Sequence, residues 1–205
     1  MKRVFDIVVS LLGLVLTSPV VLVSAIAVKL ESRGPAFYQG ERVGRDGRPF
    51  RILKLRTMRS DAESQGPSVT AGDDTRTTTV GRFLRRLKAD EMPQLVNVLK
   101  GDMSLVGPRP EHPKYVLHYT PAQRRVLTVR PGITGLSSIA FFDEEELLRG
   151  GEAESTYLSR VMPQKLELDL KYLEHATFAG DIGILGRTLL LIVLRPFAWR
   201  KHAGL

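Results

Sequence analysis

The longest apolar run of the chain lies at its N-terminus. Val4 to Val28 carries one charge, Asp6, and as a straight helix these 25 residues would extend about 37 Å, more than the roughly 30 Å hydrocarbon core of a bilayer. Pro19, near the middle, removes a backbone donor and crowds the preceding turn, so a kink is predicted at Ser18-Pro19. The hydroxyls of Thr17 and Ser18 are placed to satisfy the carbonyls that this break would free in lipid.

Basic residues flank both ends of this run. Lys2 and Arg3 precede it, and Lys29 and Arg33 follow it. Because loops on the cytoplasmic side of a membrane are enriched in Lys and Arg, both ends are predicted to face the cytoplasm. Together with the kink, this charge pattern favours a re-entrant helix over residues 1–30, which enters and leaves the membrane on the same face.

Three other interpretations of this segment stay open. A straight transmembrane anchor fits its length, and a buried core helix fits its composition, although core helices rarely stay apolar for so long. A signal peptide also fits, with Ala25-Ile26-Ala27 as the cleavage site. The apolar part of a signal peptide usually has only about 7–15 residues, which weakens this last interpretation.

The remainder, residues 31–205, has a mixed pattern with more predicted helices than strands. Residues 34–58 contain turn signals and one alternating stretch, Phe50 to Leu55, that predicts a strand. Ser60 to Thr79 is polar and predicts a surface loop over a site. Stiff turns are predicted at 107–110 and 130–135, and helices at 81–88, 90–100 with a stop at Gly101, 120–129, 163–175 and 181–194.

The last of these helices is strongly apolar, apart from Arg187, and is followed by Arg195, Trp199, Arg200 and Lys201. An aromatic ring grouped with long cations is typical of the interface between water and lipid. A plain core helix explains the apolar stretch equally well.

The composition favours anionic binding partners. The formal net charge is +8, so the chain attracts nucleic acid, anionic lipid or phosphate substrates. Aromatic residues make up only 7% and are not interleaved with the basic ones, which argues against binding of single-stranded nucleic acid. The chain has no cysteine, which excludes disulfides and thiolate zinc sites.

Asp90-Glu91 at the start of a predicted helix is the most pointed chemical feature. Capping alone explains it, because acidic residues are favoured at helix N-termini. The same position keeps a carboxylate ionised, and an ionised carboxylate is a nucleophile toward phosphorus. A capping role and a catalytic role are therefore both consistent with this pair.

Basic residues before and after this pair favour a phosphate site. An attack on a diphosphate requires neutralisation of its charge, which Arg and a divalent cation do best. Mg²⁺ is the expected metal, since the chain offers hard oxygen ligands. Arg109 stands between two prolines, which fix its backbone. A solvated face or a surface for anionic lipid is the alternative interpretation of these basic residues, namely Lys54, Arg56, Arg82, Arg85, Arg86, Arg109 and Arg130.

The motifs around these residues resemble those of the bacterial monotopic phosphoglycosyl transferases, which are polyprenyl-phosphate sugar-1-phosphate transferases. The kinked N-terminal helix is also similar to the re-entrant helix of that family, and the resemblance covers nearly the whole chain. The segments that carry it are Lys54-Leu55-Arg56-Thr57-Met58, Gly81-Arg82-Phe83-Leu84-Arg85, Asp90-Glu91-Met92-Pro93-Gln94-Leu95, Asn97 to Ser104, Gly107-Pro108-Arg109-Pro110, Val129 to Leu136 and Lys165 to Tyr172.

This resemblance implies a reaction in two steps. Asp90 would attack the β-phosphate of a UDP-sugar and release UMP, and a polyprenyl phosphate such as undecaprenyl phosphate would then take the sugar phosphate from Asp90. Glu91 would bind the metal with Asp90 or handle protons, and these two roles stay open. The matched positions assign phosphate binding or support of the site to Arg56, Arg85 and Arg109, and an acidic role of unknown kind to Asp169. Lys54 and Arg130 are added to the phosphate-binding candidates as nearby cations.

The same resemblance implies a compact, mostly helical α/β fold of the monotopic type in the bacterial inner membrane. Short strands and interfacial amphipathic helices would surround the re-entrant helix, and the active site would face the cytoplasm. Residues 1–30 and 31–205 would form one structural unit in contact with membrane lipids, and a homodimer is left open. The chain departs from the family pattern after Gly135-Leu136, where Ser137 to Phe142 leads into the acidic run Asp143 to Glu146. The donor sugar, the lipid length and the pathway are therefore left open.

Two rival functions stay in view. A membrane-peripheral interaction protein would use the apolar helix and the arginines without any reaction at Asp90. An ordinary glycosyltransferase would act on the same donor and release UDP instead of UMP.

Overall fold

The computed structural model describes residues 1–62, 65–150 and 152–202, with side chains described as far as residue 194. The side chains of Arg195, Trp199, Arg200 and Lys201 therefore lie outside the described residues. The elements in chain order are α1 (Lys2–Glu31), β1 (Phe37–Val43), η1 (Arg45–Gly47), β2 (Pro49–Leu55), α2 (Thr79–Arg86), η3 (Ala89–Gln94), α3 (Leu95–Lys100), β3 (Ser104–Val106), α4 (Pro113–Val116), η4 (Gln123–Thr128), β4 (Gly132–Thr134), α5 (Leu136–Ala140), α6 (Glu144–Leu147), α7 (Ala153–Thr156), η5 (Tyr157–Val161), α8 (Met162–His175) and α9 (Phe178–His202).

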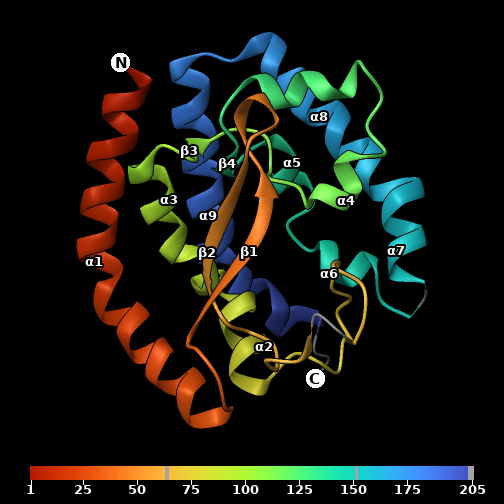
Figure 1. Ribbon diagram of the computed structural model, residues 1–205. Helices are drawn as coiled ribbons and strands as arrows, with labels where there is room; N and C mark the ends of the chain where they lie inside the picture. The colour runs from red at the N-terminus through yellow and green to blue at the C-terminus, as the bar shows by residue number, and fades with distance from the viewer. Residues whose placement is uncertain (63–64, 151, 203–205) are drawn as a thin grey trace.

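Helix α1 runs along one side of the molecule and continues through Pro19 (Figure 1). A proline at position 19 cannot donate to the carbonyl of Val15, and the hydroxyl of Ser18 donates to that carbonyl at 2.8 Å. The hydroxyl of Thr17 donates to the carbonyl of Gly13 at 2.7 Å. Of the two hydroxyls predicted to satisfy freed carbonyls, only that of Ser18 bonds to the carbonyl that Pro19 leaves without its helical donor.

The face of α1 that meets the protein mixes polar and apolar side chains, whereas the outward face is apolar. Asp6, Ser10, Ser24 and Val28 are buried, and a Cβ added to Gly13 would lie 3.0 Å from Leu95 of α3. The outward side chains include Leu16, Val23 and Leu30, which are 78%, 66% and 83% exposed. Among the described residues, α1 is the one helix long and apolar enough to cross a bilayer.

The beginning of α1 is fastened to the body of the protein by polar contacts. Arg3 donates to the carbonyls of Val98 and Leu99 at 2.7 and 3.0 Å, and so occupies the C-terminal end of α3. Asp6 accepts from the hydroxyl of Ser104 at 2.8 Å and from the amide of Leu105 at 3.3 Å. The one acidic residue of the apolar run therefore binds strand β3.

The end of α1 is fastened to the same body. The carboxylate of Glu31 accepts from the amides of Thr79 and Val80 at 2.7 and 3.0 Å, at the start of α2. Arg56, at the end of the hairpin, donates to the carbonyls of Ser32 at 2.8 Å and of Arg33. Both ends of the membrane-length helix thus contact the same body of the protein.

The described strands form two small sheets. Strands β1 and β2 form an antiparallel hairpin in which Phe37 pairs with Leu55 and Val43 with Pro49, so the strand predicted at Phe50 to Leu55 is confirmed. Strands β3 and β4 form a short parallel pair. The sequence predicted only a stiff loop at 130–135, because three residues are too few to show an alternating pattern.

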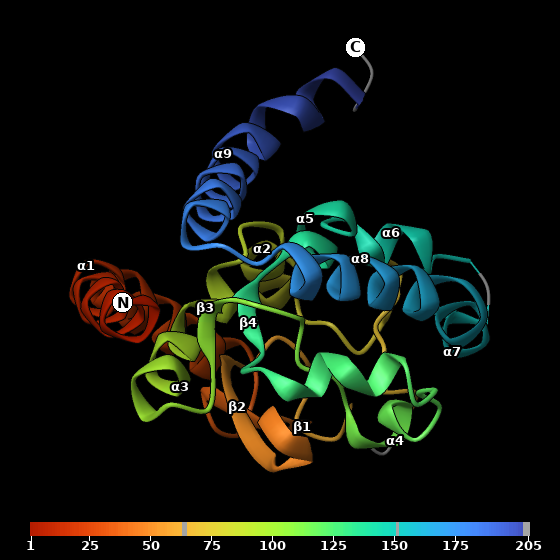
Figure 2. The same ribbon diagram turned by 90° about the horizontal axis from the view of Figure 1, so that it is seen from above.

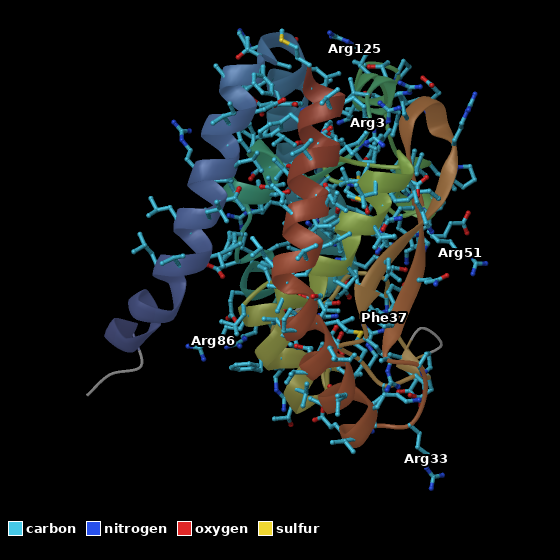
Figure 3. The ribbon with its side chains drawn as sticks, turned by 90° about the vertical axis from the view of Figure 1, so that its left-hand side faces the viewer. Arg3, Arg33, Phe37, Arg51, Arg86 and Arg125 are labelled. Carbon is cyan, nitrogen blue, oxygen red and sulfur yellow. The ribbon has the colours of Figure 1, made fainter. Side chains whose placement is uncertain are left out.

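The described part of α9 leaves an apolar surface exposed. Figure 2 shows its second half projecting away from the body, and Leu189, Leu190 and Val193 are 63%, 57% and 60% exposed. Helices α1 and α9 begin at the same end of the molecule (Figure 3), where Phe5 packs edge-on against Phe178. These exposures favour the lipid-interface interpretation of the last helix over the core-helix alternative.

The helix predicted at 90–100 differs from the observed structure in its first half. Residues 89–94 form the 3-10 helix η3, and only 95–100 are α-helical, with the predicted stop at Gly101 in a left-handed conformation. Lys88 precedes η3 with a φ of 54°, so Asp90 lies inside the first turn and is not the N-cap. The helix predicted at 120–129 is likewise 3-10, over Gln123–Thr128.

Candidate active site

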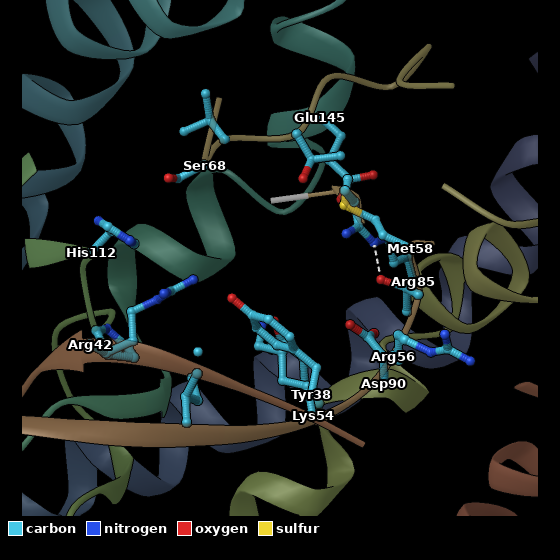
Figure 4. Close-up of a pocket in the computed structure, with 18 of the residues that line it drawn as sticks. Tyr38, Arg42, Lys54, Arg56, Met58, Ser68, Arg85, Asp90, His112 and Glu145 are labelled. Atoms are coloured by element: carbon cyan, nitrogen blue, oxygen red, sulfur yellow. Dashed lines mark hydrogen bonds and ion pairs between the residues drawn. The ribbon is translucent and has the colours of Figure 1, made fainter. Parts of the chain in front are cut away.

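A cleft of about 1030 Å³ opens between the hairpin, η3 and the segment that leads into α6. Figure 4 shows Asp90 and Arg85 at one end of the cleft and Arg42 and His112 at the other, with Lys54 and Tyr38 between them. The structure thus brings the predicted pair and most of the predicted cations to one cavity. The predicted site residues among its walls are Lys54, Arg56, Arg85, Asp90, Glu91 and Arg109.

Asp90 is held at the floor of this cleft by apolar packing beneath η3. Ala89, which precedes it, is buried with Leu55 of β2, Leu84 of α2 and Val28 of α1. Only 6% of Asp90 is exposed, and its Oδ1 has no hydrogen-bond partner among the described residues. A buried carboxylate oxygen without a donor is costly, so its presence at a cavity wall indicates a group kept free for a ligand or reaction.

The charges around Asp90 act in opposite directions. Burial raises the pKa of its carboxyl group, Lys54 opposes this, and the adjacent Glu91 adds to it. Arg85 and Lys88 also lower that pKa, although the net direction is upward. The carboxylate therefore needs its neighbouring cations, or a bound cation, to stay ionised.

Glu91 binds two of the predicted cations with one oxygen. Its Oε1 accepts from Nζ of Lys54 at 2.7 Å and from Nη2 of Arg109 at 2.8 Å. Burial alone would raise the pKa of Glu91, but Arg109, Lys54 and Lys88 outweigh it and hold the pKa well below the usual range. Glu91 is therefore a permanent anion that fixes two cations at the cleft.

Lys54 and Arg109 reach this carboxylate from different elements. Lys54 projects from β2, and Arg109 follows β3 in the turn with two prolines. Burial lowers the pKa of Lys54, while Glu91 and Asp90 raise it and Arg109 lowers it further. The pKa of Arg109 is raised above its usual value, chiefly by Glu91.

Arg85 extends from α2 toward the same end of the cleft. Its Nε donates to the hydroxyl of Thr57 at 2.7 Å, and its Nη1 pairs with Glu145 of α6 at 3.0 Å. The sequence predicted Arg85 at the site, but it did not predict that the acidic run after position 142 would contact it.

Arg56 and Arg130 occupy places that differ from the predicted phosphate-binding role. The guanidinium of Arg56 binds carbonyls at the end of α1, although the residue also lines the cleft. Arg130 donates to the carbonyl of Gly101 at 2.8 Å, where α3 ends, and is not among the residues that line the cleft. In both cases the guanidinium donates to backbone carbonyls.

Asp169 lies behind the cleft wall on α8. It is 4% exposed, and burial raises the pKa of its carboxyl group to about 6, although Ser137, Lys165 and the backbone of Arg109 each lower that pKa. This position places Asp169 in a supporting layer next to Arg109.

Sequence reasoning missed a buried polar group on another wall of the cleft. The hydroxyl of Tyr157 donates to Glu111, and Lys165 donates to Glu144 at 2.6 Å. Lys165 is only 6% exposed and also lies over the ring of Tyr157. The spacing of Lys165 and Asp169, four residues apart on one helix, was the available signal.

The carboxylates fit Mg²⁺ only in part. Among the described residues there is no group of three or more His, Asp or Glu that would hold a metal alone. Magnesium often binds through one or two carboxylates together with substrate phosphates, and the unpartnered Oδ1 of Asp90 suits that mode. Glu91 suits it less, because two cations already contact its Oε1.

Comparison with known proteins gives an extensive match. The family of bacterial sugar transferases matches residues 1–195. The chain is 43% identical over 194 residues to UDP-glucose:undecaprenyl-phosphate glucose-1-phosphate transferase of Caulobacter vibrioides, which aligns 92% of this chain and 68% of that protein.

Two further relatives show the range of lengths. The uncharacterized sugar transferase EpsL of Bacillus subtilis is 39% identical over 189 residues, with 92% of this chain and 85% of that protein aligned. UDP-glucose:undecaprenyl-phosphate glucose-1-phosphate transferase of Escherichia coli is 37% identical over 192 residues, but the chain spans only 39% of its length.

The matched region contains α1 and every predicted residue of the cleft. The resemblance drawn from the motifs between Lys54 and Tyr172 is therefore confirmed. The chain belongs to the bacterial sugar transferase family, and it is an enzyme of the phosphoglycosyl transferase type.

Proposed function

We propose that this enzyme transfers a sugar-1-phosphate from a UDP-sugar to a polyprenyl phosphate, with Asp90 as a covalent nucleophile. The observation that carries the proposal is the buried Asp90, whose Oδ1 has no partner, beside Lys54 and Arg85 in a large cleft. A buried carboxylate oxygen without a donor is costly, and its position on the wall of a large cleft supports a role with a bound ligand.

The first step forms an acyl phosphate. A carboxylate oxygen of Asp90 attacks the β-phosphorus of the donor, the bond from that phosphorus to the oxygen bridging it to the α-phosphate breaks, and UMP leaves with that oxygen. Lys54, Arg85 and Arg109 neutralise the charge that the diphosphate brings. Bound Mg²⁺ would supply further charge neutralisation, with Asp90 as its protein ligand.

The second step restores the enzyme. An oxygen of the polyprenyl phosphate attacks the phosphorus held on Asp90, the acyl phosphate bond breaks, and the carboxylate is regenerated. The product is a polyprenyl diphosphate sugar. The open role of Glu91 is best assigned as the anion that positions Lys54 and Arg109, since its lowered pKa makes it a poor proton carrier.

The names of the relatives support the substrates. The Caulobacter vibrioides and Escherichia coli proteins are both named as transferases of glucose-1-phosphate from UDP-glucose to undecaprenyl phosphate. UDP-glucose with undecaprenyl phosphate is therefore the first substrate pair to test. Other UDP-sugars follow, since an Aeromonas hydrophila relative at 36% identity is named for UDP-N-acetylgalactosamine.

The contacts of α1 support a re-entrant, monotopic placement in the inner membrane. Arg3 and Asp6 bind the body at one end of the helix, and Glu31 binds it at the other. A straight transmembrane span would carry its two ends to opposite faces of the bilayer, which separates groups that here share one body. The apolar outer face of α1 then lies in lipid, and the cleft faces the cytoplasm, where UDP-sugars are found.

The released nucleotide tests the reaction. Purified enzyme with UDP-glucose, undecaprenyl phosphate and Mg²⁺ should release UMP, and omission of the lipid should leave a sugar phosphate on Asp90 that mass spectrometry of peptides detects. The D90N variant should lose turnover and the adduct while it keeps its membrane binding. Release of UDP would indicate an ordinary glycosyltransferase, and turnover by D90N would refute the nucleophile.

A further inference from the structure

The acidic turn α6 sends its three carboxylates to three different places. Glu144 binds the buried Lys165 at 2.6 Å, and Glu146 pairs with the exposed Arg149 at 3.1 Å on the surface. Glu145, between them, reaches across the cleft to Arg85 at 3.0 Å. This turn belongs to the segment where the sequence departs from the family pattern, and the reaction proposed above gives it no role.

The contact of Glu145 occupies a nitrogen that a substrate phosphate could also bind. Arg85 stands beside Asp90 in the cleft, and Figure 4 shows Glu145 next to it. The Nε of Arg85 is bound to the hydroxyl of Thr57, and its Nη1 is bound to the carboxylate of Glu145. A carboxylate oxygen and a phosphate oxygen accept from a guanidinium in the same way.

We infer that Glu145 is a placeholder anion that occupies Nη1 of Arg85 in the free enzyme and gives this nitrogen up to the donor diphosphate. The inference rests on the proposed function, because it needs Arg85 to bind that diphosphate. It makes Glu145 a residue that sets donor affinity through competition.

Three observations favour an exchange over a permanent support. The Glu145 side chain is 42% exposed, so its pairing with Arg85 is weakened by water and easily broken. Thr57 holds the guanidinium in place without Glu145. A diphosphate carries more negative charge than one carboxylate, so it competes well for the same nitrogen.

The backbone of the turn does not have to move in this exchange. The carbonyl of Glu145 accepts from the amide of Gly72 at 2.7 Å, and Glu144 is fixed by Lys165. A rotation of the Glu145 side chain into water therefore frees Nη1 of Arg85 while the cleft keeps its shape.

Two matched variants of one turn test this inference. E145Q and E146Q each remove one negative charge from α6, but only the first touches Arg85. Binding of UDP with Mg²⁺ to the purified full chain, measured by calorimetry, should be about two- to five-fold tighter in E145Q than in the wild type, as expected for loss of a weak competing ion pair. E146Q should bind like the wild type.

Kinetics and salt add independent readouts. In E145Q the KM for the donor should fall by a similar factor without a rise in kcat, and added salt should narrow the difference from the wild type, since salt weakens exposed ion pairs. E145A should behave as E145Q does, and thermal melting checks that each variant folds.

Equal or weaker UDP binding by both Glu145 variants would overturn the inference, and weaker binding would show that Glu145 orients Arg85. UMP release by the wild type separates this failure from one of the reaction itself. If no variant binds UDP and no UMP appears, the proposed function falls, and this inference falls with it.

Discussion

At the scale of single residues, the adjacent carboxylates Asp90 and Glu91 have opposite electrostatic settings. Glu91 accepts from Lys54 and Arg109, and its pKa is lowered well below the usual range, while burial leaves the pKa of Asp90 raised. Two neighbouring acids thus divide the work: one holds cations, and the other keeps an unpartnered oxygen in the cleft.

Substitution of Glu91 by Gln should move the pH profile as well as lower the rate. Glu91 raises the pKa of both Lys54 and Asp90, so its loss lowers both. Lys54 then loses its proton at lower pH and Asp90 is ionised at lower pH, which shifts both limbs of the kcat/KM profile toward acid. We expect kcat/KM to fall by about a hundredfold, because two cations lose their anchor.

The measurement is the pH dependence of UMP release by E91Q and the wild type. Glu174 is an exposed residue whose Oε1 lies 3.9 Å from Nη1 of Arg125. The control variant E174Q should therefore leave the profile unchanged. A lower rate of E91Q without a shift in either limb of its pH profile would contradict the electrostatic role and indicate a loss of packing only.

The sequence predicted the place of Asp90 and Glu91 in the site better than it predicted the contacts of Arg56 and Arg130. Asp90 and Glu91 could be found because their signal is local: an acidic pair at a helix start, beside basic motifs. The partners of Arg56 and Arg130 are backbone carbonyls at the ends of α1 and α3, and nothing in a linear sequence indicates which carbonyl a guanidinium will meet. Glu145 was missed for the same reason, because Arg85 lies 60 residues away in the chain.

At the scale of elements, long periodic segments were predicted and short irregular ones were not. The helix α8 and the strand β2 match their predictions because their patterns run over many residues. The 3-10 form of η3 was missed, since it depends on the left-handed Lys88 before it. This turn lies against β2 and α1, so tertiary packing overrides the local preference of its sequence for an α-helix.

Arg56 joins two of these elements, and its substitution should destabilise the fold more than it affects donor binding. R56Q removes charged donors from the carbonyls at the end of α1, which should lower the free energy of unfolding by about 1–3 kcal/mol. Thermal melting in detergent measures this loss, and R51Q, a change at an exposed position of β2, is the control.

The same variant decides between two roles for this arginine. If Arg56 only joins β2 to α1, the KM of R56Q for UDP-glucose should stay within about twofold of the wild type below its melting temperature, since bound phosphate would not contact it. A large rise in KM with unchanged melting would instead restore the phosphate-binding role that the sequence predicted.

At the scale of the whole molecule, the arrangement of α1 predicts on which side of the membrane its ends lie. The chain has no cysteine, so a single introduced cysteine is the only thiol available to label. One cysteine inserted after Met1 and, separately, R45C in the exposed hairpin turn should both resist a membrane-impermeant maleimide in intact spheroplasts. Both should react after permeabilisation.

The R45C variant serves as the reference for the catalytic body. Labelling of the N-terminal cysteine in intact spheroplasts, with R45C still protected, would show that α1 crosses the membrane and would rule out the re-entrant placement. The charge pattern alone left this question open, because Lys2 and Lys29 bias an orientation but do not fix it.

The close packing of the inner face of α1 has a consequence for attempts to obtain the enzyme in water. Deletion of residues 1–30 would remove the membrane-facing surface, but it would also strip Val28 from the cluster beneath Asp90 and leave the buried Arg56 facing a gap. The shortened chain should therefore aggregate or lose its active-site floor. Replacement of outward side chains such as Leu16 and Val23 by polar ones, with Asp6 and Gly13 kept, is the better route to a detergent-free enzyme.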